Sequence, residues 1–80
     1  MEVKVKTFAG FKELFGSEFT VTFSEPVTIG DLSEKIADIF PSSKRLLSVS
    51  AFVVSDSVVD KSFELIDNSL VYLLPPCSGG

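Results

Sequence analysis

Length, composition and charge set the first limits on this chain. Its 80 residues suffice for one domain, 45% of them are hydrophobic, and the formal net charge is −4. The seven Lys and Arg residues are scattered, with one adjacent pair at Lys44 and Arg45, which disfavours a nucleic-acid-binding surface. With no His and one Cys, the chain lacks the residues for the usual metal sites and for Ser/His or Cys/His catalysis, so we expect no bound metal or cofactor and no enzyme activity of its own.

The first part of the chain predicts a β-hairpin. Residues 2–8 alternate between apolar and polar side chains, which places Val3 and Val5 on one face of a half-buried strand. Residues 18–23 alternate in the same way, so we expect a second strand paired with the first. Its predicted inward side chains are Phe19, Val21 and Phe23.

The apolar residues in the connection between these two strands have the spacing of a helix. Phe11, Leu14 and Phe15 lie on one side of a helix over residues 9–16. Gly16 occupies the position of a helix C-cap glycine. We therefore predict one or two turns of helix in this connection.

The main helix is predicted to begin after Thr28. This residue is a suitable N-cap, and Asp31 three residues later gives a weaker form of the capping box. Pro41 is expected to end the helix. The predicted core-facing stripe consists of Ile29, Leu32, Ile36, Ile39 and Phe40.

Shorter elements follow the main helix. Residues 42–48 predict a polar connection with a short helical turn, and the apolar run of residues 51–54 predicts a strand buried on much of both faces. The valine pair at 58–59 is long enough only for an edge strand. Residues 70–74 are predicted to form the last strand. The turns between these strands are predicted at Ser55-Asp56-Ser57 and Asp67-Asn68-Ser69.

This order of elements predicts an α+β domain over residues 1–74. We expect a mixed sheet of about five strands with one main helix packed across it. The helix between the first hairpin and the later strands requires a crossover, so at least one pair of strands should be parallel. The last strand is expected beside the first. Residues 75–80 would then leave one end of the sheet as a flexible tail that reaches roughly 20 Å if extended.

The tail has the composition of a reactive terminus. Pro75 and Pro76 cannot donate to a sheet ladder, so regular structure should stop there. Gly79 and Gly80 lack Cβ atoms, so their backbone can enter a narrow tunnel and an activated terminal carboxyl carbon is open to attack. A frayed end is the alternative explanation. The succession of strand, proline pair and glycine pair favours a carrier that is loaded at its carboxyl group.

The sequence predicts neither export nor a membrane span. No apolar run approaches the roughly 18 residues needed to cross a bilayer. Residues 1–4 are charged and strand-like, unlike a signal peptide. A single Cys cannot form an intramolecular disulfide, so we expect the reducing setting of the cytoplasm.

Three segments carry a resemblance to a known family. They are residues 3–16, the helix start Thr28-Ile29-Gly30-Asp31-Leu32, and residues 73–80, which read Leu-Leu-Pro-Pro-Cys-Ser-Gly-Gly. Together they resemble the MoaD family, the small sulfur-carrier subunits of molybdopterin synthase, which have the ubiquitin-like β-grasp fold and are related to the ThiS carriers. The resemblance spans essentially the whole chain, and its last segment is the most specific.

The resemblance implies a role for each tail residue. An activating enzyme would use ATP to adenylate the Gly80 carboxylate, and a sulfur donor would convert it to a thiocarboxylate. The large synthase subunit would then transfer the sulfur to a cyclic pterin precursor. Gly79 would give clearance beside Gly80. The other residues expected to contact partner proteins are Leu74, Pro75, Pro76, Cys77 and Ser78.

Some residues have two interpretations. Cys77 could take part in a sulfur relay or in a thioester with a partner, but the simpler explanation is that it replaces the small apolar residue usual at this position of the family. Phe11, Phe15 and Leu74 are candidates for an apolar partner surface near the tail or for the core. The family's Asp-Gly-Asp turn is replaced here, although Asn68 tolerates the left-handed conformation that Gly would take.

From the residues alone we predict an unhindered C-terminal carboxyl group that can be activated and that lies at the end of a flexible tail. The sulfur and pterin chemistry is implied only by the resemblance. One alternative is a sulfur carrier for thiazole synthesis or tRNA thiolation. Another is a ubiquitin-like modifier joined through Gly80 to lysines of other proteins. The third is an interaction domain whose terminus does no chemistry.

Overall fold

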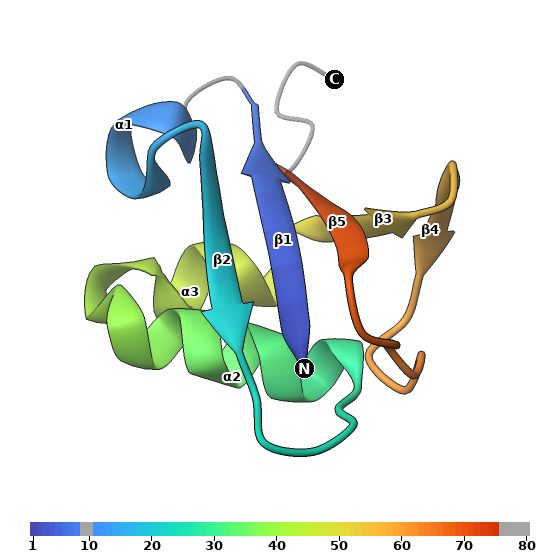
Figure 1. Cartoon of the computed structure of the whole chain (residues 1–80). Coiled ribbons are helices and arrows are strands. Elements are labelled where there is room, and N and C mark those ends of the chain that lie inside the picture. The colour runs from blue at the N-terminus through green and yellow to red at the C-terminus, as the bar shows by residue number, and fades with distance from the viewer. Residues whose placement is uncertain (9–10, 76–80) are drawn as a thin grey trace.

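The structure, a computed structural model, describes residues 1–8 and 11–75. Within these residues, five strands form one sheet in the order β2-β1-β5-β3-β4, and α2 and α3 cover one of its faces (Figure 1). The elements are β1 (Glu2–Thr7), α1 (Phe11–Phe15), β2 (Glu18–Thr22), α2 (Ile29–Ile39), the 3-10 turn η1 (Pro41–Ser43), α3 (Lys44–Ser48), β3 (Ala51–Val54), β4 (Ser57–Val59) and β5 (Ser69–Leu74). The predicted α+β order with one main helix is confirmed.

β5 occupies the centre of the sheet, between β1 and β3. β1 pairs in antiparallel fashion with β2, where Val5 lies opposite Phe19, and in parallel with β5, where Val5 lies opposite Val71. On its other side β5 pairs antiparallel with β3. The structure therefore confirms that the last strand lies beside the first and that the sheet is mixed.

The helix α1 connects β1 to β2 as predicted. The rings of Phe11 and Phe15 pack edge to face with their centroids 5.3 Å apart, and Gly16 follows the helix at φ +81°. The Thr7 hydroxyl donates a hydrogen bond to the Gly16 carbonyl, and the Thr7 N–H donates to the Ser17 carbonyl at 3.0 Å. These bonds fasten the connection to the end of β1.

The helix α2 begins with the predicted capping box. The Asp31 N–H donates to Thr28 Oγ1 at 3.2 Å, and the Thr28 N–H donates to Asp31 Oδ2 at 3.0 Å. The prediction for Ile39 is wrong, because this side chain is 49% exposed. At about 100° per residue, the buried face of α2 extends toward Ser33 and leaves Ile39 at its border. The buried residues of α2 are Ile29, Leu32, Ser33 and Ile36.

The β3–β4 hairpin is less buried than predicted. Phe52 is buried, but Ala51 and Val53 are half-buried because the helices cover only the other face of the sheet, and Val54 is half-buried at the edge of the core. β4 is the predicted edge strand. Ser55 and Asp56 join it to β3 with φ values of 52° and 67°, as in a type I′ turn. Asn68 takes the predicted left-handed conformation, at φ 65°.

The segment after α2 forms η1 and α3, in agreement with the short helical turn predicted there. Leu47 is buried and Leu46 is exposed. Among residues 1–8 and 11–75, none of the helices combines the length and the hydropathy that a transmembrane helix requires. The core lies between the helices and the inner face of the sheet. Its buried hydrophobic residues are Val3, Val5, Phe11, Phe15, Val21, Ile29, Leu32, Ile36, Leu47, Phe52, Leu65, Val71 and Leu73.

Candidate functional site

The last described residues locate the start of the tail. β5 ends at Leu74, and both Leu74 and Pro75 are half-buried. Because β5 runs parallel to β1, with Leu73 opposite Thr7, the chain reaches Pro75 at the end of the sheet where β1 also ends (Figure 1). The other predicted site residues lie outside the described residues, and their roles stay predictions: Pro76, Cys77, Ser78, Gly79 and Gly80.

An apolar surface lies on the outer face of the sheet at this end. Tyr72 and Leu74 alternate with buried neighbours in β5 and therefore point away from the helices. The Tyr72 ring stacks on that of Phe8, with centroids 5.6 Å apart and planes at 23°, and Phe8 is 41% exposed. In the β3–β5 register, Val53 and Ala51 lie opposite Tyr72 and Leu74. We call this set the tail face: Phe8, Ala51, Val53, Tyr72 and Leu74.

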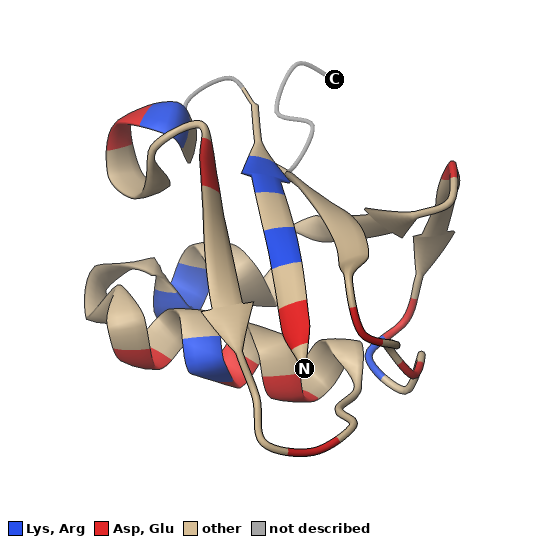
Figure 2. Cartoon of the chain, viewed as in Figure 1, with Lys and Arg blue, Asp and Glu red and all other residues tan. Residues whose placement is uncertain are grey.

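Two lysines of β1 border the tail face. In the parallel register, Lys6 lies opposite Tyr72 and Lys4 lies opposite Leu70. Lys4 Nζ is 3.5 Å from Glu18 Oε2 on β2. Figure 2 shows that the basic residues of β1 contrast with the mostly acidic surface of α2. In a chain with a net charge of −4, this border suits a partner that has carboxylates beside an apolar patch.

The structure separates the three candidates for an apolar partner surface. Phe11 and Phe15 are buried, and the Phe15 ring packs edge to face against Phe40 with centroids 4.9 Å apart. Both therefore belong to the core, whereas Leu74 belongs to the tail face. Sequence reasoning missed Phe8, although the alternation of β1, continued by one residue, places it on the outer face.

Polar residues of the described part serve local structure. Across residues 1–8 and 11–75, no group of three or more His, Cys, Asp or Glu could hold a metal ion. The Ser62 hydroxyl and N–H donate to Asp60 Oδ1 at 2.6 and 2.9 Å, and these bonds lower the pKa of the Asp60 carboxyl below its usual value. Asp60 is exposed and fixes the turn that follows β4.

One family matches the sequence over nearly its whole length. The model of the ThiS family covers residues 5–80, which include the glycine pair. No curated protein matches the chain significantly.

Solved structures match the chain from end to end. The putative molybdopterin converting factor subunit 1 of Pyrococcus furiosus has a TM-score of 0.85 at 28% identity, with 96% of this chain and 99% of that one covered. The complex of subunits 1 and 2 of the molybdopterin-converting factor of Helicobacter pylori gives 0.70 at 26% identity, with 100% of both chains covered. SAMP1 of Haloferax volcanii gives 0.83 at 20% identity, also with 100% of both chains covered. These likenesses show the ubiquitin-like β-grasp fold.

Proposed function

The chain belongs to the ThiS family, and from this premise we propose that it is the sulfur carrier of a molybdopterin synthase. The two structures named as molybdopterin converting factors support a role in molybdopterin synthesis, since they are 28% and 26% identical to the chain. SAMP1, at 20% identity, supports only the shared fold. Gly80 lies inside the family match and is the proposed sulfur-bearing residue.

Sulfur loading takes place in two steps at Gly80. The Gly80 carboxylate attacks the α-phosphate of ATP, which forms an acyl-adenylate and releases pyrophosphate. A sulfur nucleophile at the oxidation level of hydrosulfide then attacks the carbonyl carbon and expels AMP, which leaves a thiocarboxylate. Gly79 and Gly80 carry no Cβ, so no side chain hinders either attack. The groups that bind ATP belong to a separate activating enzyme.

The tail face is the proposed docking surface for the proteins that handle the tail. This proposal rests on one observation. β5 ends near the stacked rings of Phe8 and Tyr72, so the tail begins at Pro75 beside an apolar surface. Aromatic residues with apolar neighbours are typical of the centres of protein interfaces. A partner that covers this face holds the folded body while the tail enters the partner's active site.

The acceptor of the sulfur is proposed to be a large catalytic subunit. The Helicobacter pylori structure contains subunits 1 and 2 of its converting factor in one complex. By analogy, this chain supplies the thiocarboxylate, and its partner supplies the residues that transfer sulfur to a cyclic pterin precursor. Water replaces the sulfur and restores the Gly80 carboxylate, so the carrier can be loaded again.

Intact mass spectrometry with fragmentation tests the loading step. The full chain is incubated with ATP, an activating enzyme of this kind and sulfide. We expect a mass increase of one oxygen-to-sulfur exchange, localised to Gly80. A chain without Gly79 and Gly80 is the matched control and should stay unmodified. The Cys77→Val variant should load normally, because the proposed chemistry does not pass through the thiol.

A second stage identifies the acceptor. The loaded carrier is mixed with a large synthase subunit and the cyclic pterin precursor, and molybdopterin should form while Gly80 returns to a carboxylate. Peptides from cells in which Gly80 is joined to lysines, without any pterin product, would instead establish a protein modifier. A Gly80 that stays unmodified throughout would favour the interaction domain.

A further inference from the structure

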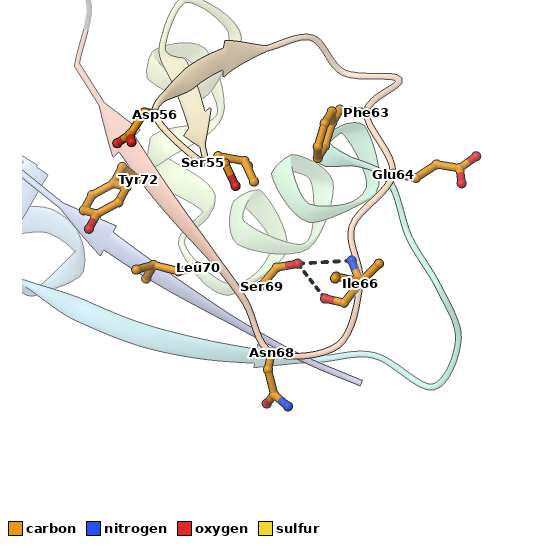
Figure 3. A pocket seen from close by; sticks show the side chains of 10 residues that line it. Ser55, Asp56, Phe63, Glu64, Ile66, Asn68, Ser69, Leu70 and Tyr72 are labelled. Atoms are coloured by element: carbon orange, nitrogen blue, oxygen red, sulfur yellow. Dashed lines mark hydrogen bonds between the residues drawn. The ribbon is translucent and has the colours of Figure 1, made fainter.

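A second surface feature lies at the end of β5 away from Pro75. It is a groove of about 480 Å³ between β5, the β3–β4 turn and the segment of residues 63–69 (Figure 3). Its apolar side chains include Phe63, Ile66 and Leu70. Along β5 the lining of the groove runs from Ser69 to Tyr72, which also belongs to the tail face, and it does not include Leu74 or Pro75.

The apolar side chains of the groove stand on a fixed backbone. Ile66 is 75% exposed, Phe63 39% and Leu70 36%. The Phe63 carbonyl accepts a hydrogen bond from the Ile29 N–H at 2.9 Å. The Ser69 hydroxyl donates to the Ile66 carbonyl at 2.6 Å and accepts from the Ile66 N–H at 3.1 Å (Figure 3). Because these bonds hold the segment in place, the groove is preformed, and binding costs little ordering of its walls.

The rims of the groove are acidic. Asp56 stands on the β3–β4 turn, and Glu64 lies on the opposite rim with its carboxylate directed outward (Figure 3). Of the described residues that line the groove, none is Lys or Arg. Lys4 lies opposite Leu70 on β1, but its ammonium pairs with Glu18 on the far side of that strand. Lys6 lies opposite Tyr72, at the end of the groove nearer the tail face. A cation at either rim is therefore attracted by a carboxylate that belongs to the lining itself.

We propose that the groove docks a segment of a partner protein that presents one apolar side chain flanked by Lys or Arg. The apolar side chain fills the space between Phe63, Ile66 and Leu70, and the flanking cations lie near Asp56 and Glu64. An acidic segment would be repelled by these carboxylates, and a small polar side chain would bury no apolar area. The inference does not depend on the sulfur chemistry. The groove shares Tyr72 with the tail face, whereas Phe8 and Leu74 do not line it.

Nuclear magnetic resonance with short peptides tests the proposal on the full chain. The blocked tripeptide Arg-Leu-Arg carries both proposed features, Glu-Leu-Glu reverses the charge, and Arg-Ser-Arg removes the apolar side chain. We expect Arg-Leu-Arg to shift the backbone N–H signals of residues 55–56 and 63–70, and the two control peptides to shift them far less. Added salt should weaken the binding of Arg-Leu-Arg, because the rim carboxylates are exposed.

Two variants locate the binding site. Asp56→Asn removes the charge and keeps the left-handed backbone at φ 67°, which Asn tolerates. We expect it to raise the dissociation constant about two- to fivefold, and Ile66→Ala to raise it about tenfold. Both side chains are exposed, so the variants should fold. Asp38→Asn, on the exposed side of α2 and outside the groove, is the matched control and should leave binding unchanged.

Four results would overturn the proposal. Equal shifts with Arg-Leu-Arg and Arg-Ser-Arg, or shifts concentrated on α2, would show a general attraction of cations to an acidic protein. Groove signals that move with protein concentration alone would assign the groove to a second copy of this chain. Groove signals that do not move at millimolar Arg-Leu-Arg would exclude a segment of this chemistry.

Discussion

The two parallel strands, β1 and β5, have the same kind of inner face but different outer faces. Toward the helices, both strands present apolar side chains that are fully buried. Toward solvent, β1 presents Lys4 and Lys6, whereas β5 presents Leu70, Tyr72 and Leu74. Polar residues such as those of β1 are usual on the solvated face of a sheet. The fold therefore does not require the apolar residues on the outer side of β5.

This difference separates the residues that keep the protein folded from those that form the proposed docking surface. The inner residues of both strands are explained by burial in one core. The outer residues of β5 gain little from the core, yet they line both the tail face and the groove. An apolar stripe on a strand that leads directly to the tail fits the proposed role of this face in docking partner proteins.

A truncation on the inner face should have the largest effect on stability. Leu73 is fully buried, so Leu73→Ala loses the burial of its side chain and leaves a cavity. We expect the free energy of unfolding to fall by about 2–5 kcal/mol. Urea unfolding followed by circular dichroism measures the change. A loss below about 1 kcal/mol would show that the inner face contributes less than its burial implies.

The adjacent outer position should affect function more than folding. Tyr72→Ala removes a half-buried ring that stacks on Phe8, so we expect a loss of only about 1 kcal/mol in the free energy of unfolding. The rate of thiocarboxylate formation at Gly80 should fall about tenfold, the size of a typical loss at an interface hot spot. Thr22→Ala on the exposed side of β2 is the control. Equal loading rates in the Tyr72→Ala variant and the unmodified chain would remove the tail face as a docking surface.

Reversal of the charge of Lys6, at the border of the tail face, should mainly lower the rate of association with a partner protein. Lys6→Glu places a carboxylate beside the tail face, and we expect the association rate with the activating enzyme to fall about threefold at low salt, with little change at high salt. Surface plasmon resonance at two salt concentrations measures both rates. A change that is the same at both concentrations would contradict an electrostatic role.

Removal of the other lysine should have the smallest effect. The Lys4–Glu18 ion pair is exposed, and such pairs contribute little because water and salt screen them. We expect Lys4→Met to change the free energy of unfolding by less than about 0.5 kcal/mol. Thermal unfolding measures this change, and a loss above about 1 kcal/mol would mean that the outer face of β1 also supports the fold.

Local patterns explain why much of the fold could be predicted from the sequence. Period-two alternation predicted β1 and β2 because one face of each strand is covered. Thr28 with Asp31 predicted the start of α2 because a capping box involves only neighbouring residues. The exposure of Ile39 was not predictable in this way. It depends on which elements cover the border of α2, and that is a property of the packed structure.

The site was predictable only in part, for a similar reason. The chemistry proposed for Gly80 follows from residue types at the terminus. The tail face requires the knowledge that Phe8 and Tyr72, distant in sequence, stack on each other. The groove depends on the position of residues 63–66, which have no periodicity and are held by hydrogen bonds to the N-terminal end of α2 and the residues before it.

The central position of β5 also has a consequence for the order of folding. β5 lies between β1 and β3, and its first residue, Ser69, pairs with Val3 near the start of the chain. The sheet closes only when almost the whole chain has folded back, a slow step for such distant partners. Until β5 docks, the first hairpin and β3 have open edges and the tail face does not exist. An activating enzyme that needs the tail face would therefore accept only finished molecules and ignore nascent or partly unfolded ones.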